Sequence, residues 1–272
     1  MKSFFIIANK KKDGSMEHAF RIGSYLESRG KCCTIRTNDE EPPADVDCVL
    51  VLGGDGTLLQ ASRELNGMDV PLLGINMGTL GYLAEIEVNG VRKALDELLE
   101  GNYFIENRML LSGEVMRAGQ VVMRDIALND IVIARRGHLR VVDFNIEVNG
   151  TFLCSYRADG IILATPTGST GYSLSAGGPI VSPDAFLILV TAIAPHTLNS
   201  RTVILPEDVQ VTVEAAGEFT EEDGADVTFD GASSLALMAG DRICVRRSER
   251  QTRLIKIRRT SFVENLRKKM NK

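Results

Sequence analysis

The stretch of sequence that is most informative about the fold reads Gly53-Gly54-Asp55-Gly56-Thr57. The apolar run at residues 48–52 predicts a buried strand before it, and residues 58–65 have the apolar spacing of a helix after it. A glycine-rich turn lets a ligand come close to the backbone, because glycine has no Cβ. The free N–H groups and the positive dipole end at the start of the helix favour a phosphate there.

Asp55 is the unusual residue in this turn, because a carboxylate repels a phosphate. Its presence indicates a group that accepts a proton or handles a metal ion. No lysine follows the glycines as it does in a P-loop. We therefore expect backbone N–H groups and a metal ion to offset the charge of the phosphates.

Residues 1–101 alternate between short apolar runs and helical spacing. Strands are predicted at residues 3–8, 32–36, 48–52 and 71–76. Strands separated by helices indicate parallel βαβ units, so we predict a Rossmann-like α/β domain at the N-terminus. Ligands of such sheets bind at the carboxyl ends of the strands, which places the glycine turn and residues 76–81 at one edge.

The pattern changes to period two in residues 102–252. Residues 142–148 alternate between apolar and polar side chains, and Asn149-Gly150 is a strong hairpin signal. Further strands are predicted at residues 110–116, 126–134, 161–165, 202–205, 209–215, 227–229, 243–246 and 253–257. The C-terminal domain is therefore predicted to be antiparallel and sandwich-like, and the acidic stretch 218–226 is expected to be an exposed loop.

Composition narrows the class of protein. The chain has 272 residues, of which 44% are hydrophobic and 25% charged, as in soluble globular proteins. No apolar stretch is long enough to span a bilayer, so no membrane association is expected. The five cysteines show no CxxC spacing, which favours buried reduced thiols in a cytoplasmic protein.

Charge is distributed unevenly along the chain. Residues 242–272 carry a formal charge of +10, whereas the remainder carries −15. A basic tail can bind nucleic acid or polyphosphate, or it can pack back on an acidic body or a neighbouring subunit. Apolar residues interleaved with the basic ones favour packing back, so residues 253–272 are predicted to fold onto the body, with no nucleic-acid partner.

A second informative segment is rich in hydroxyl groups. It reads Thr165-Pro166-Thr167-Gly168-Ser169-Thr170-Gly171-Tyr172-Ser173-Leu174-Ser175. Neutral hydroxyls suit ribose and amide groups, for which orientation matters more than charge. The alternative is a helix with a Ser/Thr cap after a tight turn.

The two segments together resemble the NAD kinase family. The resemblance rests on the glycine–aspartate turn, on Leu128-Asn129-Asp130 and on residues 165–179, which stand in the family's order and spacing. It covers roughly residues 49–240. The glycine–aspartate motif alone is shared with lipid kinases and phosphofructokinases, whereas the hydroxyl-rich segment is specific. Members often have Ala at the position of Gly171 and Glu at that of Asp130, which blurs the subsite geometry.

The resemblance implies an enzyme that phosphorylates the 2′-hydroxyl of the adenosine ribose of NAD to give NADP. The donor would be ATP or polyphosphate, and a divalent metal, with Mg²⁺ expected, would be bound with the triphosphate. Members pair a Rossmann-like domain with a β domain, bind the substrate between them, and assemble as homodimers or homotetramers.

The resemblance also implies roles for individual residues. Asp55 would be the catalytic base, and the phosphates would lie against Gly54, Gly56 and Thr57. Asp159 would bind the nicotinamide amide, and Asp230 would lie near the nicotinamide end, in this subunit or from a neighbouring one. The adenine and its ribose would be framed by Asn129, Asp130, Thr167, Thr170, Gly171, Tyr172 and Ser175. No protein side chain is expected to be a dedicated metal ligand.

Other interpretations stay open at this point. From the residues alone, Asn129-Asp130 could be an Asx turn that begins a strand, and Asp159-Gly160 could be a simple turn. The chain could be another kinase of the same superfamily, acting on a lipid or a sugar phosphate, or a dinucleotide sensor without turnover. The polar character of residues 165–175 argues against a lipid pocket, and Asp55 argues against a sensor.

Overall fold

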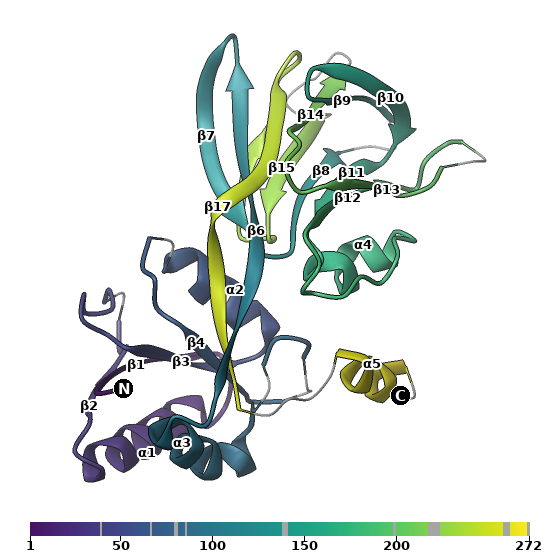
Figure 1. Ribbon diagram of the computed structural model, residues 1–272. Helices are drawn as coiled ribbons and strands as arrows, with labels where there is room; N and C mark the ends of the chain where they lie inside the picture. The colour runs from purple at the N-terminus through teal and green to yellow at the C-terminus, as the bar shows by residue number, and fades with distance from the viewer. Residues whose placement is uncertain are drawn as a thin grey trace. The chain divides into compact units, whose positions relative to one another are not determined.

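The computed structural model describes residues 1–38, 40–65, 67–78, 81–84, 86–137, 141–197, 200–216, 224–257 and 262–270. The chain divides into two compact units. The first unit is Met1–Asn107 together with Thr252–Lys272, and the second is Arg108–Gln251. Figure 1 labels most of the helices and strands of both units.

The first unit is built on a parallel sheet. Its strands run in the order β2-β1-β3-β4, all parallel, and β5 lies beside β4. The last part of β17 (Arg242–Lys256) also joins β4, where Leu254 pairs with Leu72. The elements of the first unit are β1 (Ser3–Ala8), α1 (Ser15–Ser28), β2 (Cys32–Ile35), β3 (Cys48–Gly53), α2 (Asp55–Glu64), β4 (Leu72–Asn76), β5 (Ile86–Glu87), η1 (Val88–Gly90), α3 (Val91–Glu100) and α5 (Phe262–Met270).

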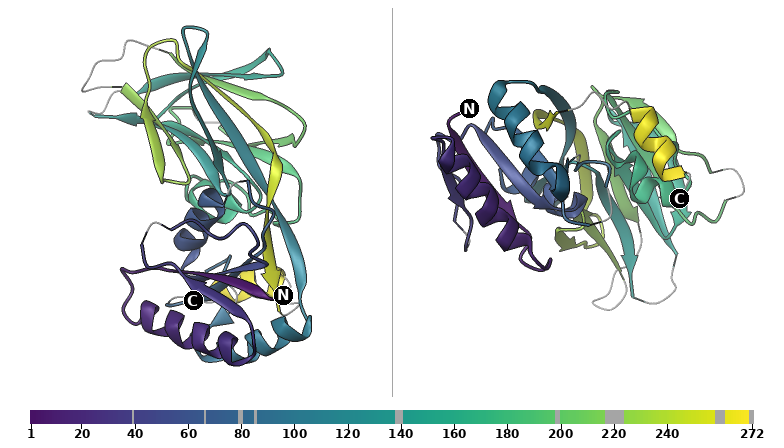
Figure 2. Two further views of the ribbon diagram at one scale, coloured as in Figure 1. Left: turned by 90° about the vertical axis from the view of Figure 1, so that its left-hand side faces the viewer. Right: turned by 90° about the horizontal axis from the view of Figure 1, so that it is seen from below.

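Helices cover both faces of this sheet, as Figures 1 and 2 show. On one face, α1 and α3 bury apolar side chains against Phe4, Ile6 and Leu50. On the other face, α2 packs so closely on β4 that a Cβ on Gly74 would lie 2.6 Å from Leu58 Cδ1. All residues of β3 and β4 are buried, which is why both strands are continuous apolar runs. The predicted Rossmann-like α/β fold is confirmed.

The second unit consists of antiparallel strands in two sheets. One sheet has the order β13-β12-β11-β8-β15-β16, and the other contains β10-β9-β14-β17 together with β6 and β7. Its elements are β6 (Phe104–Arg117), β7 (Gln120–Ala127), β8 (Asp130–Arg136), β9 (Val142–Val148), β10 (Thr151–Ala158), β11 (Gly160–Ala164), η2 (Gly168–Thr170), α4 (Tyr172–Ser175), β12 (Leu187–Ile193), β13 (Val203–Pro206), β14 (Val211–Ala216), β15 (Gly224–Phe229), β16 (Ser233–Ala236) and β17 (Arg242–Lys256).

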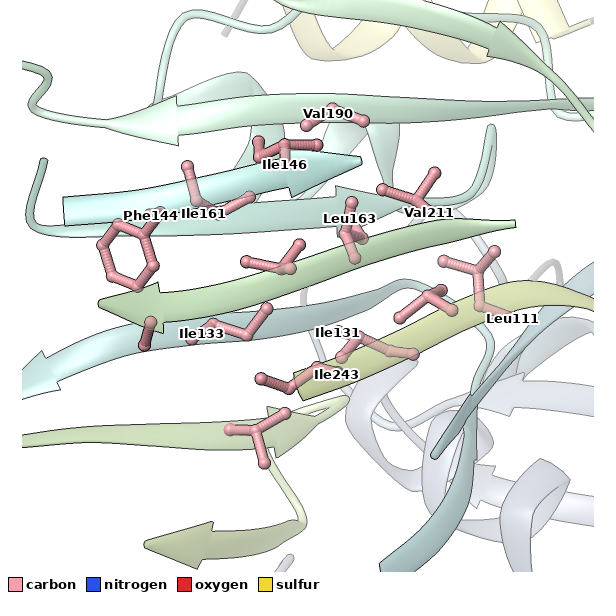
Figure 3. Packing of buried hydrophobic residues seen from close by; sticks show 14 of the residues in the cluster. Leu111, Ile131, Ile133, Phe144, Ile146, Ile161, Leu163, Val190, Val211 and Ile243 are labelled. Carbon is pink, nitrogen blue, oxygen red and sulfur yellow. The ribbon is translucent and has the colours of Figure 1, made fainter. Parts of the chain in front are cut away.

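The two sheets of this unit share one apolar core. Ile131, Ile161 and Leu163 from one sheet pack with Phe144 and Val211 from the other (Figure 3). The period-two pattern of β9 therefore buries one face of the strand, as the sequence predicts. At the predicted hairpin, Asn149 and Gly150 both have positive φ, 50° and 76°. The sandwich-like fold is confirmed.

Several local predictions differ from the structure. Helix α2 begins at Asp55, three residues before the predicted helical spacing at residues 58–65, because Gly54 O already accepts from Thr57 N and Leu58 N. The predicted strand 126–134 is two strands, and residues 243–246 and 253–257 belong to one long strand, β17. Strands β12 and β16 are not among the predicted ones. Residues 218–223 of the acidic stretch lie outside the described residues, whereas Gly224, Ala225 and Asp226 are in β15.

The cysteines are less buried than predicted. All five are free, but only Cys48 is buried, and Cys32 is exposed because it lies on β2 at the edge of the sheet. Burial raises the pKa of the Cys33 thiol to about 11. In the described part of the chain, no helix is long and apolar enough to cross a membrane.

Candidate functional site

In the first unit, the candidate site lies at the carboxyl ends of β3 and β4. The two strands are neighbours, with Gly53 paired to Asn76, and Met77 N donates to Gly53 O over 2.9 Å. The glycine turn and the loop after β4 therefore meet at one edge, as predicted, although residues 79 and 80 lie outside the described residues. Asp55 is the first residue of α2, where the helix dipole favours a negative charge.

The Asp55 carboxylate accepts three backbone hydrogen bonds from the loop after β4. Oδ2 accepts from Tyr82 N at 2.6 Å, and Oδ1 accepts from Leu83 N at 3.0 Å and from Ala84 N at 3.3 Å. A carboxylate offers about four lone-pair positions, so Oδ2 keeps one for a further donor. These three hydrogen bonds were not predictable from the sequence, because their donors are 27 to 29 positions away from Asp55 along the chain.

Gly81 leaves the space that this arrangement needs. A Cβ on Gly81 would lie 1.9 Å from Asp55 Oδ1, a distance that no packing allows. Any side chain at this position would push the carboxylate away from the three N–H groups. The absence of a side chain at Gly81 therefore allows the Asp55 carboxylate to keep its three hydrogen bonds.

The glycines of the turn have different tasks, and none of them has a positive φ. A Cβ on Gly53 would lie 2.1 Å from Thr57 Oγ1, so Gly53 makes room for Thr57. Gly56 is exposed, and a Cβ there would meet nothing within 4 Å. The N–H groups of Asp55 and Gly56 have no hydrogen-bond partner among the described residues. This part of the turn is thus open to a phosphate.

Thr57 has a structural contact in addition to its predicted role. Its Oγ1 accepts a hydrogen bond from Asn9 Nδ2 at 3.2 Å, which ties the loop after β1 to the glycine turn. The loop after β1 also brings Lys12 to the same edge. A Cβ on Gly78 would lie 3.2 Å from Lys12 Nζ, and one on Gly54 would lie 3.6 Å from it. Sequence analysis missed Lys12, although a run of lysines directly after a parallel strand was a usable signal.

In the second unit, the structure brings Asn129 and Asp130 together with the hydroxyl-rich segment. Thr165 N donates to Asn129 O at 2.9 Å, and Thr165 Oγ1 donates to Leu128 O at 2.6 Å. A Cβ on Gly168 would lie 2.1 Å from Asn129 O. Gly171 is also close, since a Cβ there would lie 3.6 Å from Asn129 Nδ2 and 3.7 Å from Asp130 Oδ2.

The hydroxyl groups of this segment fall into two sets. Thr165, Ser169 and Ser173 are buried and bond to neighbouring groups, so they hold the turn together. Tyr172 is 46% exposed and Ser175 is also exposed, which leaves both free to meet a ligand. Between these extremes, Thr170 is half-buried and Thr167 is buried. The alternative of a Ser/Thr-capped helix is wrong, because the residue before α4 is Gly171 and neither α4 nor η2 has a side-chain cap hydrogen bond.

A buried arginine supports the same turn. Arg108, which is 5% exposed, donates from Nη1 to Thr167 Oγ1 at 3.3 Å. Arg108 was not predicted from the sequence, because a single arginine two residues before the predicted strand 110–116 carries no signal of its own.

Asp230 holds the turn that carries Asn129 and Asp130. Its carboxylate accepts from the backbone N–H groups of Leu128 at 2.8 Å, Asn129 at 2.8 Å and Asp130 at 3.1 Å. Burial and the nearby Asp230 charge together raise the pKa of Asp130 to about 7. Asp230 has N–H donors for its carboxylate, whereas Asp130 retains its proton up to near-neutral pH.

Asp159 lies apart from this cluster. It comes before β11, whereas Thr165 comes after it, and a strand rises about 3.3 Å per residue, so the two are separated by roughly 20 Å. Asp159 Oδ1 accepts from Arg135 Nε at 2.6 Å. The structure therefore does not bring Asp159 to the other predicted NAD-binding residues of the same chain.

The described residues contain no group of three or more His, Cys, Asp or Glu side chains placed to hold a metal ion. The two units thus each carry a candidate site: a glycine turn with a carboxylate in the first unit and a hydroxyl-rich turn in the second. The first has the chemistry of a phosphoryl-transfer site, and the second that of a nucleoside site.

Comparison with known proteins agrees with this class. Residues 4–103 match the ATP-NAD kinase N-terminal domain, and residues 128–257 match the ATP-NAD kinase C-terminal domain. An NAD kinase of Lachnospira eligens is 44% identical over 99% of this chain and the whole of that protein. The chain therefore belongs to the NAD kinase family.

Solved structures have the same fold. An NAD kinase of Archaeoglobus fulgidus in complex with ATP aligns with a TM-score of 0.81 and 26% identity, over all of this chain and 99% of that one. A yeast NADH kinase complexed with NADH aligns with a TM-score of 0.90 and 24% identity, over all of this chain and 88% of that one, which shows the fold alone.

Proposed function

We propose that this protein phosphorylates the 2′-hydroxyl of the adenosine ribose of NAD, giving NADP, with ATP or inorganic polyphosphate as the donor. The observation that carries the proposal is the Asp55 carboxylate, which is fixed by three N–H groups beside an open glycine turn. Family membership supports the same reaction. Phosphoryl transfer asks a protein mainly for positioning and charge stabilisation, with one group to receive a proton.

Asp55 is the proposed general base. Its remaining Oδ2 lone pair takes the proton of the 2′-hydroxyl as the ribose oxygen bonds to the γ-phosphorus of ATP. The bond from that phosphorus to the oxygen bridging the β-phosphate breaks, and ADP leaves with the electron pair. With polyphosphate as the donor, the chain that leaves is one phosphate shorter. The N–H groups of Asp55 and Gly56 are the proposed contacts to the transferred phosphate, and Gly54 and Thr57 complete the phosphate site.

The residues of the second unit are proposed to hold the nucleoside. Tyr172 and Ser175 present exposed groups to the adenine and ribose, and Thr167, Thr170 and Gly171 shape the turn beside them. At neutral pH and below, protonated Asp130 can donate a hydrogen bond as well as accept one, and Asn129 can do both. Asp230 is proposed for the nicotinamide end, and Asp159, which lies apart from this cluster in its own chain, is proposed to reach that end from a neighbouring subunit. The three N–H bonds to Asp230 support its role as an organiser of the turn as well.

A divalent metal, with Mg²⁺ expected, is proposed to be bound through the oxygens of the triphosphate. Mg²⁺ is commonly held by substrate phosphates and one or two carboxylates, and it would neutralise charge that develops in the transfer. We further propose a homodimer or homotetramer in the cytoplasm. Strand β10 ends its sheet and exposes Phe152 at 62% and the adjacent Leu153 at 39%, and such an edge strand is suited to a subunit contact.

A steady-state assay of the purified protein tests this proposal. NAD and NADH are each crossed with ATP and polyphosphate in the presence of Mg²⁺, and the NADP or NADPH formed is measured. Formation of either product supports the kinase. Tight NAD binding without product for any donor would support a dinucleotide sensor instead, and transfer to diacylglycerol or fructose 6-phosphate would support another kinase of the superfamily.

A further inference from the structure

Lys12 lies in the loop between β1 and α1, at the same sheet edge as Asp55. β1 and β3 are parallel neighbours, with Ala8 paired to Leu52, so the loops that follow them lie next to each other. Within the loop, Lys12 N donates to Asn9 O at 3.0 Å and Ser15 N donates to Lys12 O at 3.2 Å. The backbone of Lys12 is thus fixed at both sides.

The ammonium group of Lys12 lies over two glycine backbones from two different loops. The distances are 3.2 Å from Nζ to a Cβ built on Gly78 and 3.6 Å to one built on Gly54. Any side chain at Gly78 would crowd Nζ, because contacts of 3.0–3.4 Å are tighter than most. The absence of side chains at both positions leaves the ammonium close to the backbone of the glycine turn.

Both loops around Lys12 are held by side-chain amides. Asn9 Nδ2 donates to Thr57 Oγ1 at 3.2 Å, and Asn76 Nδ2 donates to Gly78 O at 2.7 Å. Asn76 is 2% exposed, and its Oδ1 has no hydrogen-bond partner among the described residues. Hydrogen bonds in all three loops therefore fix the loop of Lys12 next to the loops that carry Gly54 and Gly78.

The charge of Lys12 has no partner within the described part of the chain. No carboxylate of the described residues lies within ion-pair distance of its Nζ, although the side chain is half-buried. The neighbouring lysines differ: Lys10 Nζ donates to Thr37 O, and Lys11 is exposed. A half-buried ammonium beside an open glycine turn is suited to an anion.

A triphosphate at this turn needs such a cation. The donor carries several negative charges, and Asp55 adds another in the same place, so backbone N–H groups alone leave repulsion. P-loop enzymes meet this need with a lysine directly after their glycines, which this chain lacks after Gly56. Lys12 brings a positive charge to the glycine turn from a different loop.

We propose that Lys12 binds the phosphates of the phosphoryl donor, a nucleoside triphosphate or an inorganic polyphosphate, beside Gly54 and Gly78. The inference rests on the proposed kinase function, because that function places the donor at the glycine turn. Lys12 supplies a positive charge that offsets the negative charge of the donor phosphates, which neither the glycines nor Asp55 can supply.

Direct binding measurements test this role. Wild type, Lys12→Ala, Lys12→Arg and the matched control Lys11→Ala are titrated calorimetrically with a non-hydrolysable ATP analogue and Mg²⁺, with tripolyphosphate, and with NAD. Lys12→Ala is expected to weaken binding of the ATP analogue or tripolyphosphate by roughly 10- to 100-fold, the effect of one charged hydrogen bond. Lys12→Arg retains most of the affinity, and Lys11→Ala changes nothing. NAD affinity stays within about twofold for all variants.

The outcomes separate this proposal from the kinase proposal. Donor affinity of Lys12→Ala within twofold of wild type for both donors would overturn the inference, and so would an equal loss of NAD affinity. A loss for one donor only assigns Lys12 to that donor. If wild type forms no NADP but its donor binding depends on Lys12, the kinase proposal fails and the phosphate site stands. Thermal unfolding of each variant verifies that it is folded.

Discussion

At the scale of single residues, the Asp55 carboxylate has two tasks. It holds the backbone of residues 82–84 through three hydrogen bonds, and it is the proposed base. The hydrogen bonds fix both oxygens, so the direction of the remaining Oδ2 lone pair is also fixed. The position of Asp55 between glycines was predictable from the sequence, because strand, turn and helix signals are local. Its hydrogen-bond partners, 27 to 29 positions away, were not.

Asp55→Asn is expected to reduce kcat by roughly 10²–10⁴-fold, the usual contribution of a general base. The amide cannot take the proton, and its NH₂ group faces a backbone N–H instead of accepting from it. NAD affinity, measured by calorimetry, should change little. Asp45→Asn, at an exposed carboxylate, is the matched control. Turnover of Asp55→Asn near the wild-type rate would remove Asp55 as the base.

Gly81→Ala tests whether the position of Asp55 matters as much as its chemistry. The new methyl group would lie 1.9 Å from Oδ1 and must displace the carboxylate. We expect kcat to fall roughly 10- to 100-fold, since a shift of about 1 Å at a reacting group has that effect. Gly90→Ala is the control, because nothing lies within 4 Å of its Cβ and its φ is −97°. Normal kcat in Gly81→Ala would show that the carboxylate need not be held here.

At the scale of elements, the sequence predicted the alternating strand β9 and the continuous strands β3 and β4, but it missed β12. Strand β9 was found because its apolar residues alternate. Strand β12 is a continuous apolar run, which periodicity alone does not separate from a buried helix. In β17, exposed charged residues at 246, 249 and 250 interrupt the pattern, so one strand was predicted as two. The adjacency of Asp130 and Asp230, which are 100 positions apart, depends on β8 pairing with β15.

This pairing predicts a pH dependence of stability. The pKa of Asp130 is raised to about 7 in the folded protein, first by burial and then by Asp230. The folded state therefore binds a proton that the unfolded state releases between about pH 4 and pH 7, and stability falls as pH rises through this window. Each pKa unit corresponds to about 1.4 kcal/mol, so the loss is a few kcal/mol at most.

Asp130→Asn should remove this loss, because the amide is neutral at every pH. Denaturant unfolding at pH 5 and pH 8 is expected to show a variant that gains stability relative to wild type at pH 8. Asp143→Asn is the control: Arg157 lowers the pKa of Asp143, so its contribution has the opposite sign and is lost only at acidic pH. An equal difference between wild type and Asp130→Asn at both pH values would contradict the raised pKa.

At the scale of the whole molecule, the basic C-terminal part is involved in the fold of the first unit. Arg253 forms an ion pair with Asp69 at 2.9 Å, and Lys256 Nζ lies 3.8 Å from Glu106. Lys256 Nζ also donates to Leu83 O at 3.4 Å, and Leu83 N is one of the donors to Asp55. The apolar residues interleaved with the basic ones predicted such packing, but not that it reaches the loop that holds Asp55.

Lys256→Met is therefore expected to lower kcat about two- to tenfold, the effect of one hydrogen bond to the loop. KM for NAD should stay unchanged, since Lys256 acts through Leu83. Arg253→Ala is the control, because Asp69 is 86% exposed and such a pair contributes little. Unchanged kcat in Lys256→Met would show that the loop holds its position without the C-terminal strand.

The central claim is that Asp55 serves the transfer of a phosphoryl group to the 2′-hydroxyl of NAD. The most direct measurement is ³¹P NMR of the product formed from NAD, ATP and Mg²⁺ by wild type and by Asp55→Asn. We expect a new 2′-phosphomonoester signal of NADP with wild type, and its near absence over the same time with the variant. A phosphate at another position, no product with wild type, or equal product with both proteins would contradict it.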